Sequence, residues 1–146
     1  MNIRKHHLIA SALLAAALVI AAFAMSASAA SPVKIANCPG VSRPKTLTRP
    51  TTLTLTCGDG NTVLKAMSWS SFGGASAVGK GTFITNTCNP NCASGKDVSY
   101  PAQVTATSPK KCKGGVSVYS KIALTFTGAK KPGPGVPRKW TFFCPS

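Results

Sequence analysis

The chain of 146 residues has very few side chains that can transfer a proton. It contains two histidines, His6 and His7, both near its start, no glutamate, and two aspartates, Asp59 and Asp97. Ser-His-Asp and Cys-His nucleophile systems need an imidazole, glycoside hydrolysis needs paired carboxylates, and catalytic zinc usually needs histidine. None of these sites can be assembled after residue 7. We therefore expect a protein that is not an enzyme.

The two aspartates stand where turns are expected, in Gly58-Asp59-Gly60-Asn61 and directly after Ser94-Gly95-Lys96. Aspartate is common in turns because its side chain hydrogen-bonds to nearby backbone. A calcium loop is not predicted, since no glycine follows Asp59 at the required place and no glutamate completes the ligands. Gly79-Lys80-Gly81 lacks the spacing of a phosphate-binding loop. We expect no metal and no cofactor.

The first 29 residues have the pattern of a secretory signal peptide. Arg4 and Lys5 precede an apolar run from Leu8 to Met25, and Ala27-Ser28-Ala29 matches an A-x-A cleavage site. A single membrane anchor is the alternative, because the apolar run is near the lower length limit for one. The cleavage triplet favours removal. We predict that residues 30–146 form one secreted domain with no stable membrane span.

Acidic side chains are almost absent, whereas basic ones are abundant. The chain has 17 Lys and Arg against 2 Asp and Glu. Without Arg4 and Lys5, 15 basic side chains remain against two carboxylates, which is a net charge of +13. Such a surface attracts polyanions because binding releases their counterions. The same charge would also keep an exported protein soluble.

The six cysteines all follow the predicted cleavage site, at Cys38, Cys57, Cys88, Cys92, Cys112 and Cys144. An even count in an oxidising compartment predicts three disulfides. A zinc site at Cys88 and Cys92 is not favoured, because structural zinc sites are completed by a second close pair or by histidine. If consecutive strands run up and down, Cys57 lies at the same end as Cys88 and Cys92, and we expect it to bond one of them. Cys112 and Cys144 would lie at the opposite end.

Apolar and polar side chains alternate with a period of two after residue 30, and helical spacing is absent. The clearest cases are segments 51–57, 102–107, 116–127 and 140–144. In segment 116–127 the alternation puts Val118, Ile122 and Leu124 on the apolar face and Tyr119 on the polar face. Segment 72–81 holds four glycines and predicts a loop.

These patterns predict one all-β domain, a small disulfide-stabilised sandwich or barrel. It would contain six strands, or seven if Val33–Ile35 pairs with another segment. Small residues such as Ala102, Ala106 and Ser120 fall on inward rows. We therefore expect a thin core.

Seven basic residues on predicted loops are the candidate contacts for an anionic partner. The preferred group flanks the Gly/Pro-rich segment 128–137, and the second group surrounds Cys112. Strand counting puts the two groups at opposite ends of the sheet. Trp140 either adds an aromatic face to the first group or belongs to the core. The groups are Lys130, Lys131, Arg138 and Lys139, and Lys110, Lys111 and Lys113.

The chain resembles a group of small secreted actinobacterial proteins that carry no assigned activity. The resemblance covers roughly Cys57 to Phe126, and the group often has Trp-Gly where this chain has Phe72-Gly73. It implies secretion and an all-β body, and it supplies no catalytic residues. The pattern is Cys57-x-Asp59-Gly60-Asn61, Trp69, the glycine-rich segment Gly73–Gly81, Asn86-x-Cys88-x-Pro90-x-Cys92-Ala93-x-Gly95, Tyr100-Pro101 and Pro109-Lys110-x-Cys112.

Two classes of function remain. The first is a secreted module that binds anionic material of the cell envelope or its surroundings, such as wall polymers, nucleic acid or acidic glycans. The second is an effector directed at another protein, an inhibitor or an antimicrobial factor, because a disulfide-held scaffold with a Pro-rich loop presents a preorganised contact. Binding to a polyanion weakens steeply with salt, whereas insertion of a loop into a protein cleft does not.

Overall fold

The computed structural model describes residues 32–38 and 45–144, all of which belong to the compact unit Ser31–Ser146. This part of the chain is built from strands, turns and loops, with one short 3₁₀ turn at Lys113–Gly115 among the described residues. The all-β prediction is confirmed. The predicted signal peptide, residues 1–29, lies outside the described residues.

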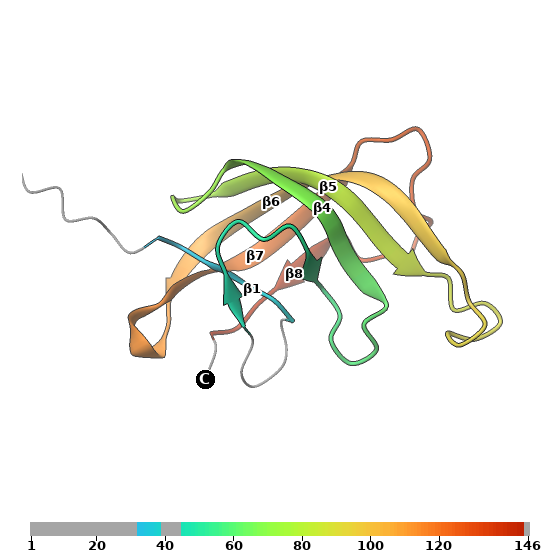
Figure 1. Ribbon diagram of the computed structural model, residues 1–146, viewed down its shortest axis with the longest axis horizontal. Coiled ribbons are helices and arrows are strands. Elements are labelled where there is room, and N and C mark those ends of the chain that lie inside the picture. Colours follow the sequence, from blue (N-terminus) through green and yellow to red (C-terminus); the bar gives the residue numbers. More distant parts are fainter. Residues whose placement is uncertain (1–31, 39–44, 145–146) are drawn as a thin grey trace, which may run out of the picture. The chain divides into compact units, whose positions relative to one another are not determined.

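Six strands form one antiparallel sheet in the order β3-β4-β5-β6-β7-β8, so each strand pairs with its neighbour in sequence (Figure 1). Two further strands, β1 and β2, form a separate two-stranded sheet. The bounds are Ile35–Ala36 (β1), Thr46–Leu47 (β2), Leu53–Thr54 (β3), Thr62–Ser71 (β4), Ala77–Asn86 (β5), Asp97–Lys111 (β6), Ser117–Phe126 (β7) and Lys139–Thr141 (β8).

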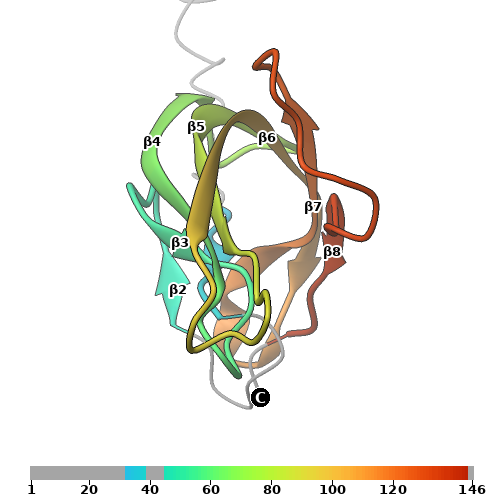
Figure 2. The ribbon, with the colours of Figure 1, turned by 90° about the vertical axis from the view of Figure 1, so that its right-hand side faces the viewer.

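The segment around β1 joins β7 to the edge strand β3 of the larger sheet, which curls strongly from β3 round to β8 (Figure 2). The Lys34 N–H donates to the Ser117 carbonyl (2.8 Å), and the Tyr119 N–H donates to the Lys34 carbonyl (3.0 Å). Four residues later the Cys38 N–H donates to the Thr54 carbonyl on β3 (3.1 Å). Segment 33–38 therefore bridges β7 and β3 and gives the sheet a barrel-like closure. Segment Val33–Ile35, which the sequence predicted as a seventh strand if it paired, does pair: Lys34 with β7 and Ile35 with β2.

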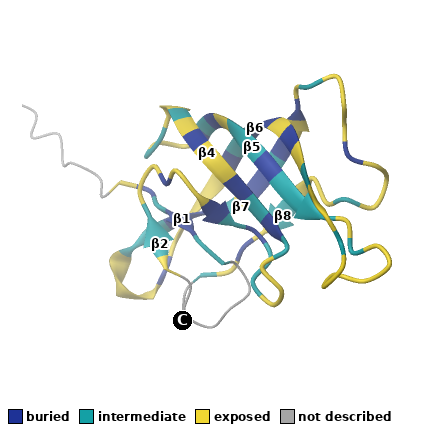
Figure 3. Cartoon of the chain, turned by 45° about the vertical axis from the view of Figure 1, so that its right-hand side comes forward, coloured by how far each residue is buried: buried dark blue, intermediate teal, exposed yellow. Residues whose placement is uncertain are grey.

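The main core lies inside this curled sheet and takes buried residues from strands β3 to β7, with Trp140 of β8 packed against it (Figure 3). Phe83 lies at its centre, with its ring centroid 5.3 Å from that of Phe126 and 6.5 Å from that of Tyr100. Ala102 and Ala106 face inward on β6, as the alternation predicted. The aromatic rings supply the volume that these small residues leave.

Tyr119 was expected on the polar face, and that prediction is wrong. Its side chain is fully buried in the main core, and its hydroxyl accepts from the Gly73 N–H (2.9 Å) and donates to the Gly74 carbonyl (3.0 Å). The alternation changes face between Tyr119 and Ile122. On the neighbouring strand Ser108 has a positive φ of 56°, and the Ser120 hydroxyl donates to the Ser108 carbonyl (2.8 Å).

The glycine-rich segment is only partly a loop, because β5 begins at Ala77 and contains Gly79 and Gly81. A Cβ at Gly79 would lie 2.8 Å from the Ser68 carbonyl oxygen, and a Cβ at Gly81 would lie 2.9 Å from that of Lys65 and would overlap the Met67 sulfur. The register of β4 against β5 shifts on both sides of this point. These glycines therefore serve close approach of the bulged strand β4, and glycine count alone could not distinguish that role from a loop.

All six cysteines form disulfides, as predicted, but Cys57 bonds Cys38, and Cys88 bonds Cys92. The expectation that Cys57 bonds Cys88 or Cys92 is wrong because it left out segment 33–38, which the Cys38–Thr54 hydrogen bond brings beside β3. The expected proximity itself is confirmed, since the Asn61 amide lies 3.8 Å from the Cys88 sulfur. Cys112 bonds Cys144.

Candidate functional site

Positive charge dominates the surface of the described residues, which include fourteen Lys and Arg and two carboxylates. All of these basic side chains except Lys34 are exposed. No ion pair forms within residues 32–38 and 45–144. The basic residues are Lys34, Lys45, Arg49, Lys65, Lys80, Lys96, Lys110, Lys111, Lys113, Lys121, Lys130, Lys131, Arg138 and Lys139.

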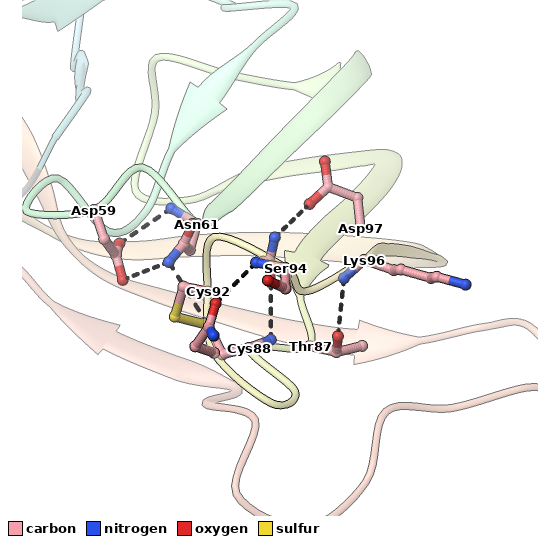
Figure 4. The surroundings of a disulfide bond; sticks show 10 residues. Asp59, Asn61, Thr87, Cys88, Cys92, Ser94, Lys96 and Asp97 are labelled. Carbon is pink, nitrogen blue, oxygen red and sulfur yellow. Dashed lines mark hydrogen bonds between the residues drawn. A yellow bond between two sulfur atoms is a disulfide. The ribbon is translucent and has the colours of Figure 1, made fainter.

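The two carboxylates do not face each other as a catalytic pair (Figure 4). Asp59 accepts from the backbone N–H and the side-chain amide of Asn61, both at 3.0 Å. The Asn61 N–H is the main cause that lowers the pKa of Asp59 below its ordinary value of 3.8. Asp97 opens β6 and accepts from the Asn86 amide (3.3 Å). The turn prediction is therefore confirmed for Asp59, whereas Asp97 directly follows its turn and is the first residue of β6.

Polar side chains hold the Cys88–Cys92 loop in the same region (Figure 4). The side-chain Oδ1 of Asn86 accepts from the Cys88 N–H (2.8 Å), and the Thr87 hydroxyl accepts from the Lys96 N–H (3.0 Å). A Cβ at Gly95 would overlap Asn86 and lie 2.7 Å from the Cys88 nitrogen. Within the described part of the chain, no three His, Cys, Asp or Glu residues come together to hold a metal.

The two predicted basic groups lie at opposite ends of the sheet, as strand counting indicated (Figure 1). We call the end that carries the connection 127–138 the loop end, and the end at which residues 112–116 join β6 to β7 the hairpin end. The turn that contains Asp59 and the start of β6 at Asp97 are at the loop end. No described residue at the hairpin end carries a carboxylate side chain.

At the loop end the four predicted residues have different surroundings in the structure. Arg138 lies over the Phe126 ring, with its Cζ 5.5 Å from the centroid, and thus covers the core. Arg138 is nevertheless exposed, so it stays a candidate contact for an anionic partner. Lys130 and Lys131 are exposed on a connection that is anchored by Pro132, which is buried.

Lys139 lies on β8 beside Lys121 of β7, and both line a shallow groove of about 350 Å³ with Thr107, Ala123 and Thr141. Lys121 was not predicted as a contact, although it follows the same outward alternation as Thr125. Trp140 also borders the groove, but its ring packs on the core, 6.4 Å from Phe83 between centroids. The core interpretation of Trp140 is the one the structure supports.

At the hairpin end a fourth lysine joins Lys110, Lys111 and Lys113. Lys34 forms an isolated β-bridge with Val118 on one side of β7, and Lys110 of β6 pairs with Val118 on the other side. Adjacent strands lie about 4.8 Å apart, so the two lysine Cα atoms are about 10 Å apart across a fully buried Val118. The sequence placed Lys34 between two apolar residues but did not indicate that its strand pairs with β7.

A second hollow, of about 380 Å³, lies beside this lysine group. It is lined by Pro32, Lys34, Gly114, Gly115, Val116 and Ser117. Gly114 and Gly115 have φ values of 81° and 82°, and a Cβ at either would meet nothing within 4 Å.

Neither a family model, a curated protein nor a solved structure matches the chain. Among the described residues, no helix is long and apolar enough to cross a membrane.

Proposed function

We propose that the protein is a secreted, non-enzymatic module that binds anionic polymers of the cell envelope or the extracellular medium. One observation carries the proposal: thirteen of the fourteen described basic side chains are exposed, and none is in an ion pair within the described residues. A lysine that has no acidic partner loses no existing ion pair when it meets a phosphate, sulfate or carboxylate group. The contact is then favourable mainly because it releases the polymer's counterions.

Two further features support this class of function. The side chains of both carboxylates are hydrogen-bonded to asparagine amides, so neither is arranged to attack a substrate or to transfer a proton. Three disulfides indicate an oxidising compartment. Anionic wall polymers, nucleic acid and acidic glycans are the polyanions found in such surroundings.

The alternative is an effector that contacts another protein through the connection between β7 and β8. Its buried Pro132 and half-buried Val136 fix that loop against the body of the domain, which would lower the entropy cost of a contact. A contact of this kind depends on shape and apolar burial and so responds weakly to salt.

The test is equilibrium binding of the protein that begins at Ala30 to heparin, double-stranded DNA and poly(glycerol phosphate), with neutral dextran as the control. We expect log Kobs to fall linearly with log salt, with a slope of about −3 to −5 if four to six charges are contacted. Dextran should not bind. Absence of binding to every polyanion at about 50 mM salt, or a slope near zero, would contradict the proposal.

A further inference from the structure

The hollow at the hairpin end combines an accessible backbone with unopposed positive charge. Gly114 and Gly115 require glycine because of their positive φ values and not because of crowding, since nothing lies within 4 Å of either position. Without side chains on these two residues, a ligand can approach the main chain closely. Lys34 lines the same hollow, and Lys113 directly precedes Gly114.

No acidic side chain of the described residues competes for these lysines. Asp59, in a turn, and Asp97, the first residue of the 15-residue strand β6, are both at the loop end. Lys110, Lys111 and Lys113 are at the hairpin end of β6 or just beyond it. Among the described residues, the loop end therefore presents side chains of both charges to an anion, and the hairpin end presents only positive ones.

The aromatic side chains narrow the class of ligand. Proteins that hold single-stranded nucleic acid stack successive bases on exposed aromatic rings. Here Tyr119 and Tyr100 are buried, and Trp69 and Trp140 pack against the core. Trp69 also donates its indole N–H to the Pro50 carbonyl (2.9 Å). Of the described large hydrophobic residues only Phe143 is exposed, so the surface lacks the series of rings that base stacking needs.

We propose that this hollow is a subsite for one phosphate group of a phosphodiester polymer without bases, of the polyol-phosphate kind. Lys34 and Lys113 would meet the phosphate charge, and Gly114 and Gly115 would leave room for its oxygens against the backbone. Lys110 and Lys111 would meet the next phosphates along the chain. This inference rests on the proposed function and goes further by naming the site and the ligand chemistry.

The experiment is an amide NMR titration of the protein that begins at Ala30, with inorganic tripolyphosphate and then poly(glycerol phosphate) as probes. Gly114, Gly115 and Lys34 amides should shift first. In Lys34→Gln/Lys113→Gln the affinity for both probes should fall about tenfold, which is the loss of two charge contacts. The matched control Lys65→Gln/Lys80→Gln removes the same charge from β4 and β5 and should cost much less. The spectra themselves establish that both variants fold.

Each other outcome overturns the inference in a different way. If the shifts centre on residues 128–139, or if the two double variants weaken binding equally, polyanion binding stands but the hollow is not the subsite. If single-stranded DNA of equal charge binds more tightly than poly(glycerol phosphate), the ligand class is wrong. If no polyanion binds at low salt, the proposed function fails, and the subsite with it.

Discussion

Single side chains inside the curled sheet decide how it packs, and Tyr119 is the clearest example. Its hydroxyl joins β7 to the Gly73–Gly74 turn through two hydrogen bonds, at 2.9 and 3.0 Å. Its ring also contacts Phe72 edge to face, with centroids 5.7 Å apart. The side chain therefore ties the β4–β5 connection to the opposite wall of the sheet.

We expect Tyr119→Phe to lower the free energy of unfolding by about 1–2 kcal/mol, because two hydrogen bonds to the Gly73–Gly74 turn are lost while the ring stays. Chemical denaturation with the disulfides intact measures this loss. Tyr100→Phe is the matched control, since the Tyr100 ring packs on Phe83 and Phe126 and its hydroxyl has no hydrogen-bond partner among the described residues. Equal losses in the two variants would contradict this role of the Tyr119 hydroxyl.

Glycine positions allow a second test at this scale. In Gly81→Ala the new Cβ would lie 2.9 Å from the Lys65 carbonyl oxygen, so the backbone of β4 must move. We expect a loss of about 1–3 kcal/mol, as in other overpacked interiors. Gly133→Ala, where a Cβ meets nothing within 4 Å, should change stability by less than about 1 kcal/mol. If Gly81→Ala left the free energy of unfolding unchanged in thermal or denaturant unfolding, this would show that β4 moves without loss of stability.

At the scale of elements, the sequence predicted strands better than their partners. Alternation located the inward rows of β3, β6 and the second half of β7, because each of these has one face on the core. It failed at Tyr119, where the alternation changes face, and at Gly79 and Gly81, whose role depends on a bulge in the neighbouring strand. Contacts that depend on a distant segment leave no local signal. The bridge that segment 33–38 forms between β7 and β3 is the largest of them, and its contact with β3 brings Cys38 beside Cys57.

The disulfides should differ in their contribution to stability according to the chain length each one closes. Cys88–Cys92, Cys38–Cys57 and Cys112–Cys144 span 4, 19 and 32 residues. The chain-entropy model predicts losses of about 2, 3 and 3.7 kcal/mol for the paired Cys→Ser variants. Denaturant unfolding of the three double variants checks the order. A larger loss for Cys88–Cys92 than for Cys38–Cys57 would show that the 88–96 loop matters more than the closure of the sheet.

For the whole molecule, stability and polyanion affinity should change little in mild acid, because almost no side chain titrates there. Histidine is the side chain whose ordinary pKa lies between pH 5 and 8, and residues 30–146 contain none. Asp59 has a pKa lowered by its hydrogen bond from Asn61, so its contribution is present above the unfolded value of 3.8 and is lost as pH falls through the folded pKa. Thermal midpoints and polyanion affinity should be constant between about pH 5 and 7, and stability should fall only below about pH 4. A step near pH 6 in either measurement would contradict this.

The candidate site was predictable in part. The number of basic residues is a property of the sequence, whereas their positions relative to one another depend on the topology of the sheet. The sequence located two groups of loop lysines and their opposite ends correctly. It did not indicate that Arg138 covers Phe126, that Lys121 lies beside Lys139, or that Lys34 reaches the hairpin end. All three depend on which strands are neighbours, which the folded chain alone determines.

Two basic groups at opposite ends of one rigid sheet should allow the protein to bridge polymer chains. We expect long poly(glycerol phosphate) to scatter light when mixed with the protein at comparable charge, and the scattering to vanish with excess polymer, where each protein meets two separate partners only rarely. Lys110→Gln/Lys111→Gln/Lys113→Gln and Lys130→Gln/Lys131→Gln/Lys139→Gln each remove three charges from one end. Arg138 is kept because it packs on Phe126.

Each of these triple variants should still bind the polymer, with a salt slope reduced by up to about 2, but should no longer produce scattering, since one end alone cannot join two chains. The control Lys45→Gln/Lys65→Gln/Lys80→Gln removes the same charge away from both groups, and it should still scatter. If the control loses scattering as fully as the end variants do, total charge rather than its division between the two ends causes the association. If neither end variant loses it, the remaining lysines on the outer face of the sheet are enough to hold a second chain.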